Sequence, residues 1–119
     1  MPNRLVIAIV QDVDTDDLSY AFREKSIPAT KISSTGGFLS EGNTTFLVAI
    51  HDEELNNVLE IIRTSCKPRT KIVNTQSLEA PIFPPITGIA YPLKVQIGGA
   101  TVIVIPILKF ENLPAQQTS

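Results

Sequence analysis

Apolar positions along this sequence follow first a strand pattern and then a helix pattern. Residues 5–10 form a continuous apolar run of strand length that is rich in β-branched side chains. Leu18 and Phe22 then lie four positions apart, on one face of a predicted helix. Residues 29–35 have a composition typical of a strand, and residues 44–50 form the next apolar strand. The first half of the chain therefore predicts the order strand, helix, strand, strand.

The second half begins with another amphipathic helix. Its predicted apolar face consists of Leu55, Val58, Leu59 and Ile62. Residues 71–73 predict a short strand after this helix. Residues 74–90 contain three prolines and no sustained periodicity, so we expect a long irregular loop there. A loop of this length within a compact domain is commonly functional.

Two further strands and a polar tail complete the pattern. Residues 93–97 alternate as a strand does, residues 100–107 are apolar, and the tail 111–119 is expected to be frayed. The order βαββαβ with an additional C-terminal strand is that of a ferredoxin-like α+β sandwich, in which both helices cover one face of an antiparallel sheet. We expect residues 1–119 to form a single domain.

The first and last predicted strands share an unusual feature. Residues 5–10 and 101–105 are apolar on both strand faces instead of alternating. Two helices can cover only one face of the sheet, so the other face is predicted to be a large apolar surface. Such a surface is typical of an interface, and we expect an oligomer that buries the sheets against one another.

Composition and charge exclude several classes of protein. The chain is 43% hydrophobic, and its formal net charge of −2 argues against a nucleic-acid binder, which needs a basic excess. The apolar run near the N-terminus is too short for a signal peptide, and no run approaches the roughly 18 residues of a membrane span. One cysteine, Cys66, and one histidine, His51, cannot form an internal disulfide or a structural zinc site. We expect a cytoplasmic protein without a bound metal.

No set of side chains predicts catalysis. His51 lies where a strand gives way to a helix and is expected to cap that helix or face solvent, and Cys66 is expected to act as a small buried apolar residue. Four acidic residues follow the first strand: Asp12, Asp14, Asp16 and Asp17. They lack the glycine and the terminal glutamate of a calcium-binding loop. We expect Asp14 or Thr15 to cap the first helix instead.

A glycine-rich segment at residues 35–45 is the first candidate binding site. It is not a Walker motif, because no Gly-Lys-Ser/Thr follows. The pair Gly36–Gly37 lets a backbone approach a ligand closely, Phe38 offers a ring for stacking, and Asn43 can contact an adenine edge through its amide. A turn with an apolar anchor explains the same residues, so nucleotide binding and a purely structural loop both remain open.

Two other features bear on this site. The pair Gly98–Gly99 lies between two predicted strands, and taken alone it is best explained by a hairpin with a glycine turn. Three basic residues follow the second helix, and they would add positive charge if the chain folds back there: Lys67, Arg69 and Lys71.

Together, these segments resemble the cyclic-di-AMP receptor family of PII-like signalling proteins. The resemblance extends from Leu5 to about Phe110. The stretches that carry it are residues 7–12, 29–31, 35–39, 42–46 and 98–102.

The resemblance implies a homotrimer with no catalytic activity, no cofactor and a nucleotide bound in each cleft between neighbouring subunits. The implied ligand-binding residues are Thr30, Gly36, Gly37, Phe38, Leu39, Asn43, Gly98 and Gly99. In this comparison Thr30 donates its hydroxyl, Phe38 and Leu39 pack on adenine, and Asn43 reads the edge of the base. Ligand binding is implied to order the loops, which then present a surface to an unknown protein partner.

Three positions depart from the family pattern. Pro28 occupies a position where Arg is found, Ile103 a position where an aromatic residue often stacks on the second base, and Asn112 a position where Gln is sometimes found. Two alternatives therefore stay open. The first is a PII-like trimer that senses a different adenine nucleotide or a small anion. The second is a small enzyme on a ferredoxin-like scaffold.

Overall fold

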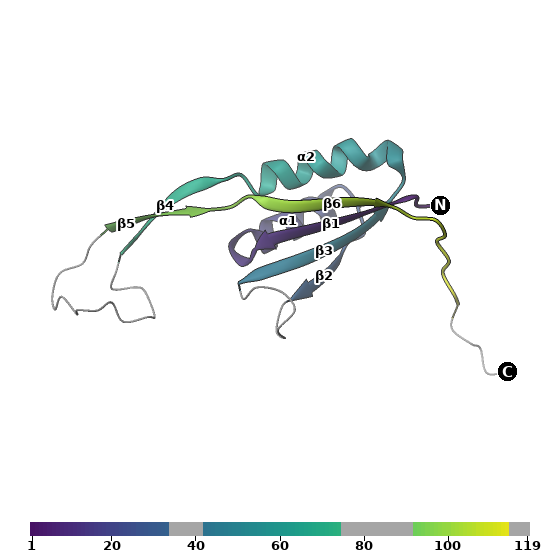
Figure 1. Cartoon of the computed structure of the whole chain (residues 1–119), viewed down its shortest axis with the longest axis horizontal. Coiled ribbons are helices and arrows are strands. Elements are labelled where there is room, and N and C mark those ends of the chain that lie inside the picture. Colours follow the sequence, from purple (N-terminus) through teal and green to yellow (C-terminus); the bar gives the residue numbers. More distant parts are fainter. Residues whose placement is uncertain (34–41, 75–91, 115–119) are drawn as a thin grey trace.

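The structure is a computed structural model that describes residues 1–33, 42–74 and 92–114 (Figure 1). The strands are β1 (Arg4–Gln11), β2 (Thr30–Ser33), β3 (Asn43–Ile50), β4 (Arg69–Asn74), β5 (Pro92–Ile97) and β6 (Ala100–Pro106). The helices are α1 (Asp12–Glu24), a short 3-10 helix (Asp52–Glu54) and α2 (Leu55–Ser65). Within the described ranges, β2, β3, β1 and β6 form one antiparallel sheet in that order. This is the ferredoxin-like arrangement, so the predicted fold class is confirmed.

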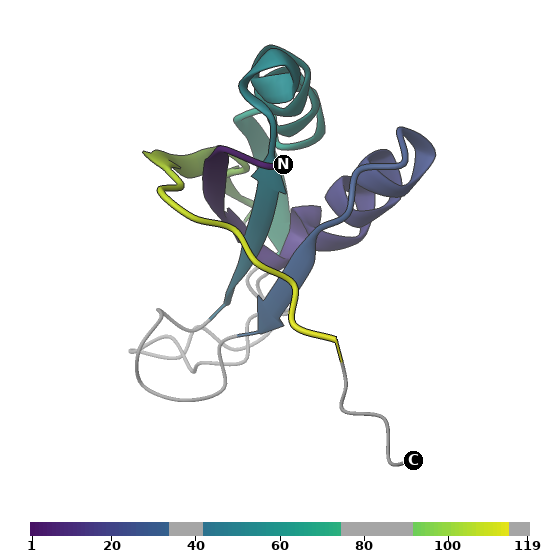
Figure 2. The ribbon, with the colours of Figure 1, turned by 90° about the vertical axis from the view of Figure 1, so that its right-hand side faces the viewer.

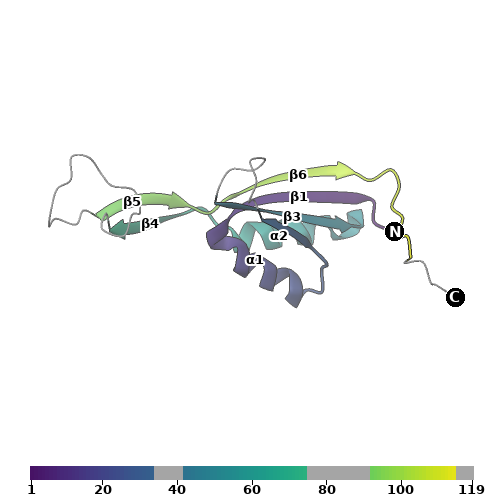
Figure 3. The same cartoon turned by 90° about the horizontal axis from the view of Figure 1, so that it is seen from below.

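One face of the sheet packs against both helices, as Figures 2 and 3 show. Alternate β1 residues Val6, Ala8 and Val10 are buried on this face. Phe22 of α1 meets Phe46 of β3 edge to face, with ring centroids 5.9 Å apart. The period of two in the strands and the helical repeat in α1 thus converge on one core.

Among the described residues, no helix covers the opposite face, which is also apolar (Figure 3). The register pairs Ile7 with Ile103 and Leu5 with Ile105, on the side of β1 that faces away from the helices. Ile103 and Ile105 are 44% and 40% exposed. We call this surface the open face, defined by Leu5, Ile7, Ile9, Leu47, Ala49, Ile103 and Ile105. The sequence pattern of residues 5–10 and 101–105 is explained by these two apolar surroundings, the core under the helices on one side and the open face on the other.

Strands β4 and β5 form a separate two-stranded ribbon that extends beyond the end of the sheet (Figure 3). The additional strands are therefore inserted between α2 and β6, and the expected addition at the C-terminus is not found among the described residues. The C-terminal strand β6 instead completes the sheet. The physical reason is that Ala100–Pro106 is apolar enough to lie beside β1, whereas Arg69–Asn74 is largely polar.

The start of α1 differs from the prediction. The helix begins at Asp12, its N-cap is Gln11 without a side-chain cap, and Asp14 and Thr15 are buried within the first turns. The expected cap at Asp14 or Thr15 is therefore wrong, because Asp14 is engaged elsewhere in the structure. The expectation for His51 is confirmed, since its side chain accepts a hydrogen bond from the backbone N–H of Glu53 at the start of the 3-10 helix.

Most of the predicted long loop 74–90 lies outside the described residues, as does part of the predicted tail 111–119. Asn74 itself is the last residue of β4, and residues 111–114 have no helix or strand. Among the helices described, none is long and apolar enough to cross a membrane.

Candidate functional site

Half of the predicted ligand-binding residues can be placed in the fold. Gly36, Gly37, Phe38 and Leu39 lie outside the described residues. The structure places Thr30 at the start of β2, Asn43 at the start of β3, and Gly98 and Gly99 in the two-residue junction between β5 and β6. These two strands belong to different sheets and do not pair, so the glycine hairpin expected at this junction is not formed.

Asn43 lies opposite the last residue of β1. The register pairs Asn43 with Gln11, and both residues belong to the strand face that points away from the helices. Neighbouring hydrogen bonds fix this end of the sheet: the Asp12 N–H donates to the Gly42 carbonyl at 2.9 Å, and the Thr44 hydroxyl donates to Asp12 Oδ1 at 2.7 Å. Asn43 is thus held in a defined register at the rim of the open face.

The Gly98–Gly99 junction lies at the same end of the sheet, where it contacts Gln11. The Gly98 N–H donates to Gln11 Oε1 at 2.8 Å, and the Gly99 N–H donates to the Cys66 carbonyl at 2.6 Å. Both glycines have positive φ, +89° and +80°. A Cβ on Gly98 would overlap the Lys67 carbonyl, so glycine is required there for a close approach of two chain segments as well as for the backbone conformation.

Thr30 lies apart from this group within one chain. It pairs with Leu47 on the open face, and Leu47 is four residues further along β3 than Asn43, or about 13 Å at strand rise. The structure therefore brings together Asn43, Gly98 and Gly99, and it does not bring Thr30 to them in a single chain. Gln11 is the residue of this group that the sequence did not single out; its position at the end of a buried strand, before a turn, was the available signal.

The three departures from the family pattern lie in different places. Ile103 pairs with Ile7 in the middle of the open face, and Asn112 follows β6 in a segment without regular structure. Pro28 lines a groove of about 360 Å³ between α1 and β2, together with Arg23 and Lys31. Lys31 pairs with buried Phe46 on the helix side of the sheet, so it faces away from the side that carries Thr30.

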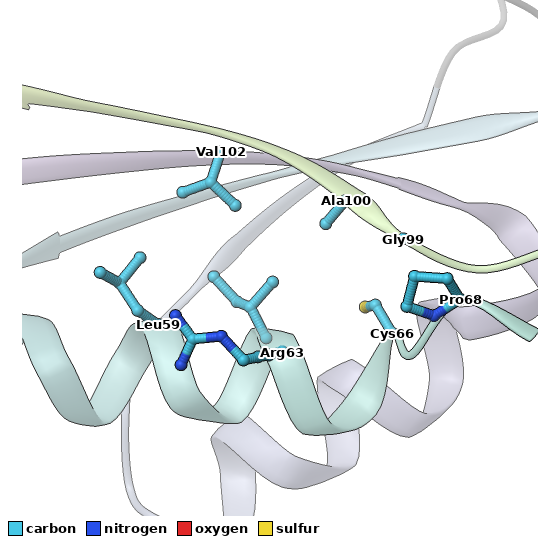
Figure 4. Close-up of a pocket in the computed structure, with 8 residues that line it drawn as sticks. Leu59, Arg63, Cys66, Pro68, Gly99, Ala100 and Val102 are labelled. Carbon is cyan, nitrogen blue, oxygen red and sulfur yellow. The ribbon is translucent and has the colours of Figure 1, made fainter.

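A second cavity lies between α2 and β6 (Figure 4). It has a volume of about 330 Å³ and is lined by Leu59, Ile62, Arg63, Cys66, Pro68, Gly99, Ala100 and Val102. Most of these side chains are apolar. Arg63 contributes the charge, and its guanidinium is paired with Glu60 at 2.6 Å. The cavity can accept an apolar group and offers no set of free polar partners for a phosphate.

An ion pair between a buried carboxylate and a partly exposed guanidinium joins α1 to the ribbon. Arg69 Nη2 lies 2.9 Å from Asp14 Oδ1, and Asp14 is fully buried. One of the three basic residues after the second helix thus folds back onto the body of the protein, although it pairs with a carboxylate and not with a ligand. The adjacent thiol of Cys66 is buried as expected, and burial, with a smaller contribution from Asp14, raises its pKa to about 11.

Within the ranges that the structure describes, no group of three or more histidine, cysteine or carboxylate side chains is arranged to hold a metal ion. The residues brought together at the end of the sheet are amides, backbone groups and one ion pair. This arrangement can bind and position a polar ligand by hydrogen bonding.

Comparisons with known proteins connect this arrangement to a family. Residues 3–113 match the family model described as cyclic-di-AMP receptor. A protein of unknown function from Pediococcus pentosaceus ATCC 25745 has a similar crystal structure, with 44% sequence identity, a TM-score of 0.71, and coverage of 95% of this chain and 99% of that one.

A more distant relationship shows the fold. CPII, a nitrogen regulatory PII-like protein from Thiomonas intermedia K12 whose structure contains ADP, AMP and bicarbonate, has 10% identity and a TM-score of 0.55, with coverage of 95% and 98% of the two chains. The match over residues 3–113 shows that this chain belongs to the cyclic-di-AMP receptor family, and its fold is PII-like.

Proposed function

We propose that this protein is a signalling receptor that binds cyclic-di-AMP at the interfaces of a homotrimer and has no catalytic activity. The single observation that carries the proposal is the convergence of Asn43 with the Gly98–Gly99 junction, through Gln11, at one end of the sheet in a chain of this family. We further propose that it acts in the cytoplasm.

The geometry supports distinct roles for these residues. An asparagine amide carries N–H donors and a carbonyl acceptor, and one of each from Asn43 would suit the edge of adenine. The N–H groups of Gly98 and Gly99 are already engaged by Gln11 and by the Cys66 carbonyl. We therefore infer that these glycines contribute a close approach of the backbone to the ligand and not N–H donors.

The separation of Thr30 from Asn43 supports a site shared between subunits. In one chain the two residues lie about 13 Å apart along the sheet, whereas a ligand between subunits meets different edges of two chains. The apolar open face supplies the surface that holds such subunits together. The remaining members of the proposed site, Gly36, Gly37, Phe38 and Leu39, follow from the resemblance alone.

The signal is proposed to reach a protein partner through the ordering of the loops around the ligand. A ligand shifts such an equilibrium only by the difference between its affinities for the two states. The partner is a protein whose identity the sequence and fold leave open.

One alternative ligand is favoured by a specific observation. Pro28 and Ile103 place no charge and no aromatic ring at positions where the family pattern has them, and Ile103 lies in the middle of the open face. A charged donor and a stacking ring are each worth about 1–3 kcal/mol in binding. The loss of these two groups weakens the specific case for cyclic-di-AMP, so a receptor that holds another adenine nucleotide or a small anion through other groups is the alternative.

The proposal is tested by comparing two asparagine variants in a calorimetric titration with cyclic-di-AMP. Asn43→Ala removes the amide at the end of the sheet, and Asn56→Ala removes an exposed amide on α2 as a matched control. We expect Asn43→Ala to weaken binding about tenfold or more and Asn56→Ala to leave it unchanged. Equal affinity of both variants would remove Asn43 from the site.

A further inference from the structure

The two legs of the β4–β5 ribbon meet the body of the protein at one narrow place. We call it the crossing, and it consists of residues 66–69 and 97–99. Here the Gly99 N–H donates to the Cys66 carbonyl, and Gly98 packs directly on the Lys67 carbonyl. Figure 4 shows Pro68 and Gly99 side by side at this point. The chain segments are in such close contact that one leg cannot shift without displacing the other.

Two side chains tie the crossing to the body. Gln11, at the end of β1, holds the Gly98 N–H at 2.8 Å. Asp14, in α1, binds Arg69 Nη2 at 2.9 Å, and Arg69 Nη1 in turn donates to the Lys67 carbonyl at 3.0 Å. Arg69 thus links α1 to the same carbonyl on which Gly98 packs.

The burial of Asp14 makes it costly to separate this residue from Arg69. Asp14 is fully buried, and its second oxygen, Oδ2, has no hydrogen-bond partner among the described residues. A buried carboxylate that loses its cation is strongly destabilised, so the ribbon cannot move away with Arg69 and leave Asp14 unpaired at little cost. Arg69 makes the two contacts from two different nitrogens of a planar guanidinium, whereas a lysine would have to make both from a single ammonium nitrogen.

We propose that the Asp14–Arg69 pair is a positioning pair that fixes the orientation of the ribbon and of the Gly98–Gly99 junction, and thereby sets the affinity of the nucleotide site. The second part rests on the proposed function. Neither residue touches the ligand in this account. They act through the Lys67 carbonyl, to which Arg69 donates and on which the Gly98–Gly99 junction packs.

The experiment combines amide hydrogen exchange of the ligand-free protein with titration of cyclic-di-AMP. The test variants are Arg69→Met, Arg69→Lys, Asp14→Asn and the double variant Asp14→Asn with Arg69→Met. Two controls separate a local effect from general destabilisation. Glu60→Gln removes the charge from the exposed pair with Arg63. Val58→Ala opens a cavity in the core at a residue outside both the proposed ligand site and the crossing.

We expect Arg69→Met to raise exchange in residues 69–74 and 92–97 at least about tenfold relative to the strands of the main sheet. Arg69→Lys should give an intermediate effect, because it keeps the charge but not both contacts. The double variant should be no worse than Arg69→Met, since both substitutions remove the same interaction. Val58→Ala should raise exchange without this preference for the ribbon, and Glu60→Gln should change neither measurement.

The titration should show that Arg69→Met weakens nucleotide binding about fivefold or more. Val58→Ala should lower the melting temperature by a similar amount but should lower the affinity less. Ribbon exchange that follows the main sheet in every variant, or affinities of Arg69→Met and Val58→Ala that agree, would overturn the proposal. If the unmodified protein binds no cyclic-di-AMP, the proposed function fails and the affinity part fails with it. The exchange measurement then still decides whether the pair anchors the ribbon.

Discussion

The side chain of Gln11 accepts a hydrogen bond from the backbone N–H of Gly98 at 2.8 Å, although the two residues are 87 positions apart in the chain. Gln11 also lies opposite Asn43 in the sheet. One residue therefore connects the two, because the backbone of Gln11 is in register with Asn43 and its side chain binds the junction at the base of the ribbon. This connection explains why two glycines and an asparagine that are distant in sequence meet at one end of the sheet.

Replacing Gln11 with methionine tests this connection. Methionine preserves the length of the side chain but leaves the Gly98 N–H without an acceptor, which should lower the free energy of unfolding by about 1–3 kcal/mol. Gln96→Met, on an exposed position of β5, is the matched control and should change it little. Urea denaturation measures both variants, and equal midpoints would show that the hydrogen bond contributes nothing.

Among the described residues, three glycines have positive φ. Comparing alanine at each of them separates the cost of the backbone conformation from the cost of steric overlap. Gly42 and Gly99 have space for a methyl group, with nothing within 4 Å at Gly42 and the Pro68 ring at 3.9 Å at Gly99. Alanine at either position should cost about 1–2 kcal/mol, from the backbone conformation alone. Alanine at Gly98 should cost at least about 1 kcal/mol more, because its Cβ would overlap the Lys67 carbonyl. Thermal unfolding of the three variants provides the comparison, and equal losses would contradict the close packing at Gly98.

The open face should hold the subunits of the proposed homotrimer together. Ile103→Lys places a charge in the middle of this face, where it must be desolvated in an assembled oligomer. We expect light scattering after size-exclusion chromatography to give a trimer for the unmodified protein and smaller species for this variant. Ile72→Lys, on the exposed ribbon, should leave the mass unchanged. An unaffected mass for Ile103→Lys would exclude the open face as the interface.

Cys66 predicts a loss of stability in alkaline solution. Its pKa in the folded protein is about 11, above the ordinary value of 9.0, chiefly because the thiol is buried. The unfolded thiol therefore loses its proton first, and the contribution of Cys66 is present below about pH 9 and is lost as the pH rises to about 11. We expect this part of the loss to be on the order of 2 kcal/mol.

The measurement is the free energy of unfolding between pH 8 and pH 11 for the unmodified protein and for Cys66→Ala. The variant should start less stable, because alanine leaves a small cavity, but should lose less stability over this range. Parallel curves for the two proteins would show that the thiol does not titrate as its burial predicts.

The sequence predicted the main sheet because its signals are local. A strand with apolar residues on both faces, such as residues 5–10, and a helix with one apolar face, such as α2, are each recognisable from spacing alone. The prediction placed the additional strand at the C-terminus because spacing does not say which strand pairs with which. That choice depends on the better fit of Ala100–Pro106 than of Arg69–Asn74 beside β1, which is a property of the assembled sheet.

The candidate site was predicted in part for the same reason. Asn43 and the Gly98–Gly99 pair stand out as residue types suited to ligands and turns. Gln11 and the Asp14–Arg69 pair do not, because their roles depend on contacts across 87 and 55 positions of the chain. Asp14 or Thr15 was expected to cap α1, whereas α1 begins two residues before Asp14 and the buried Asp14 carboxylate pairs with Arg69.

The central claim is that this chain binds cyclic-di-AMP, and calorimetric titration of the purified protein tests it most directly. The account predicts saturation at one ligand per subunit, with no competition from ATP, ADP or cyclic-di-GMP. Absence of binding over a wide concentration range, or tighter binding of one of the other nucleotides, would contradict it while leaving the PII-like fold and the family membership in place.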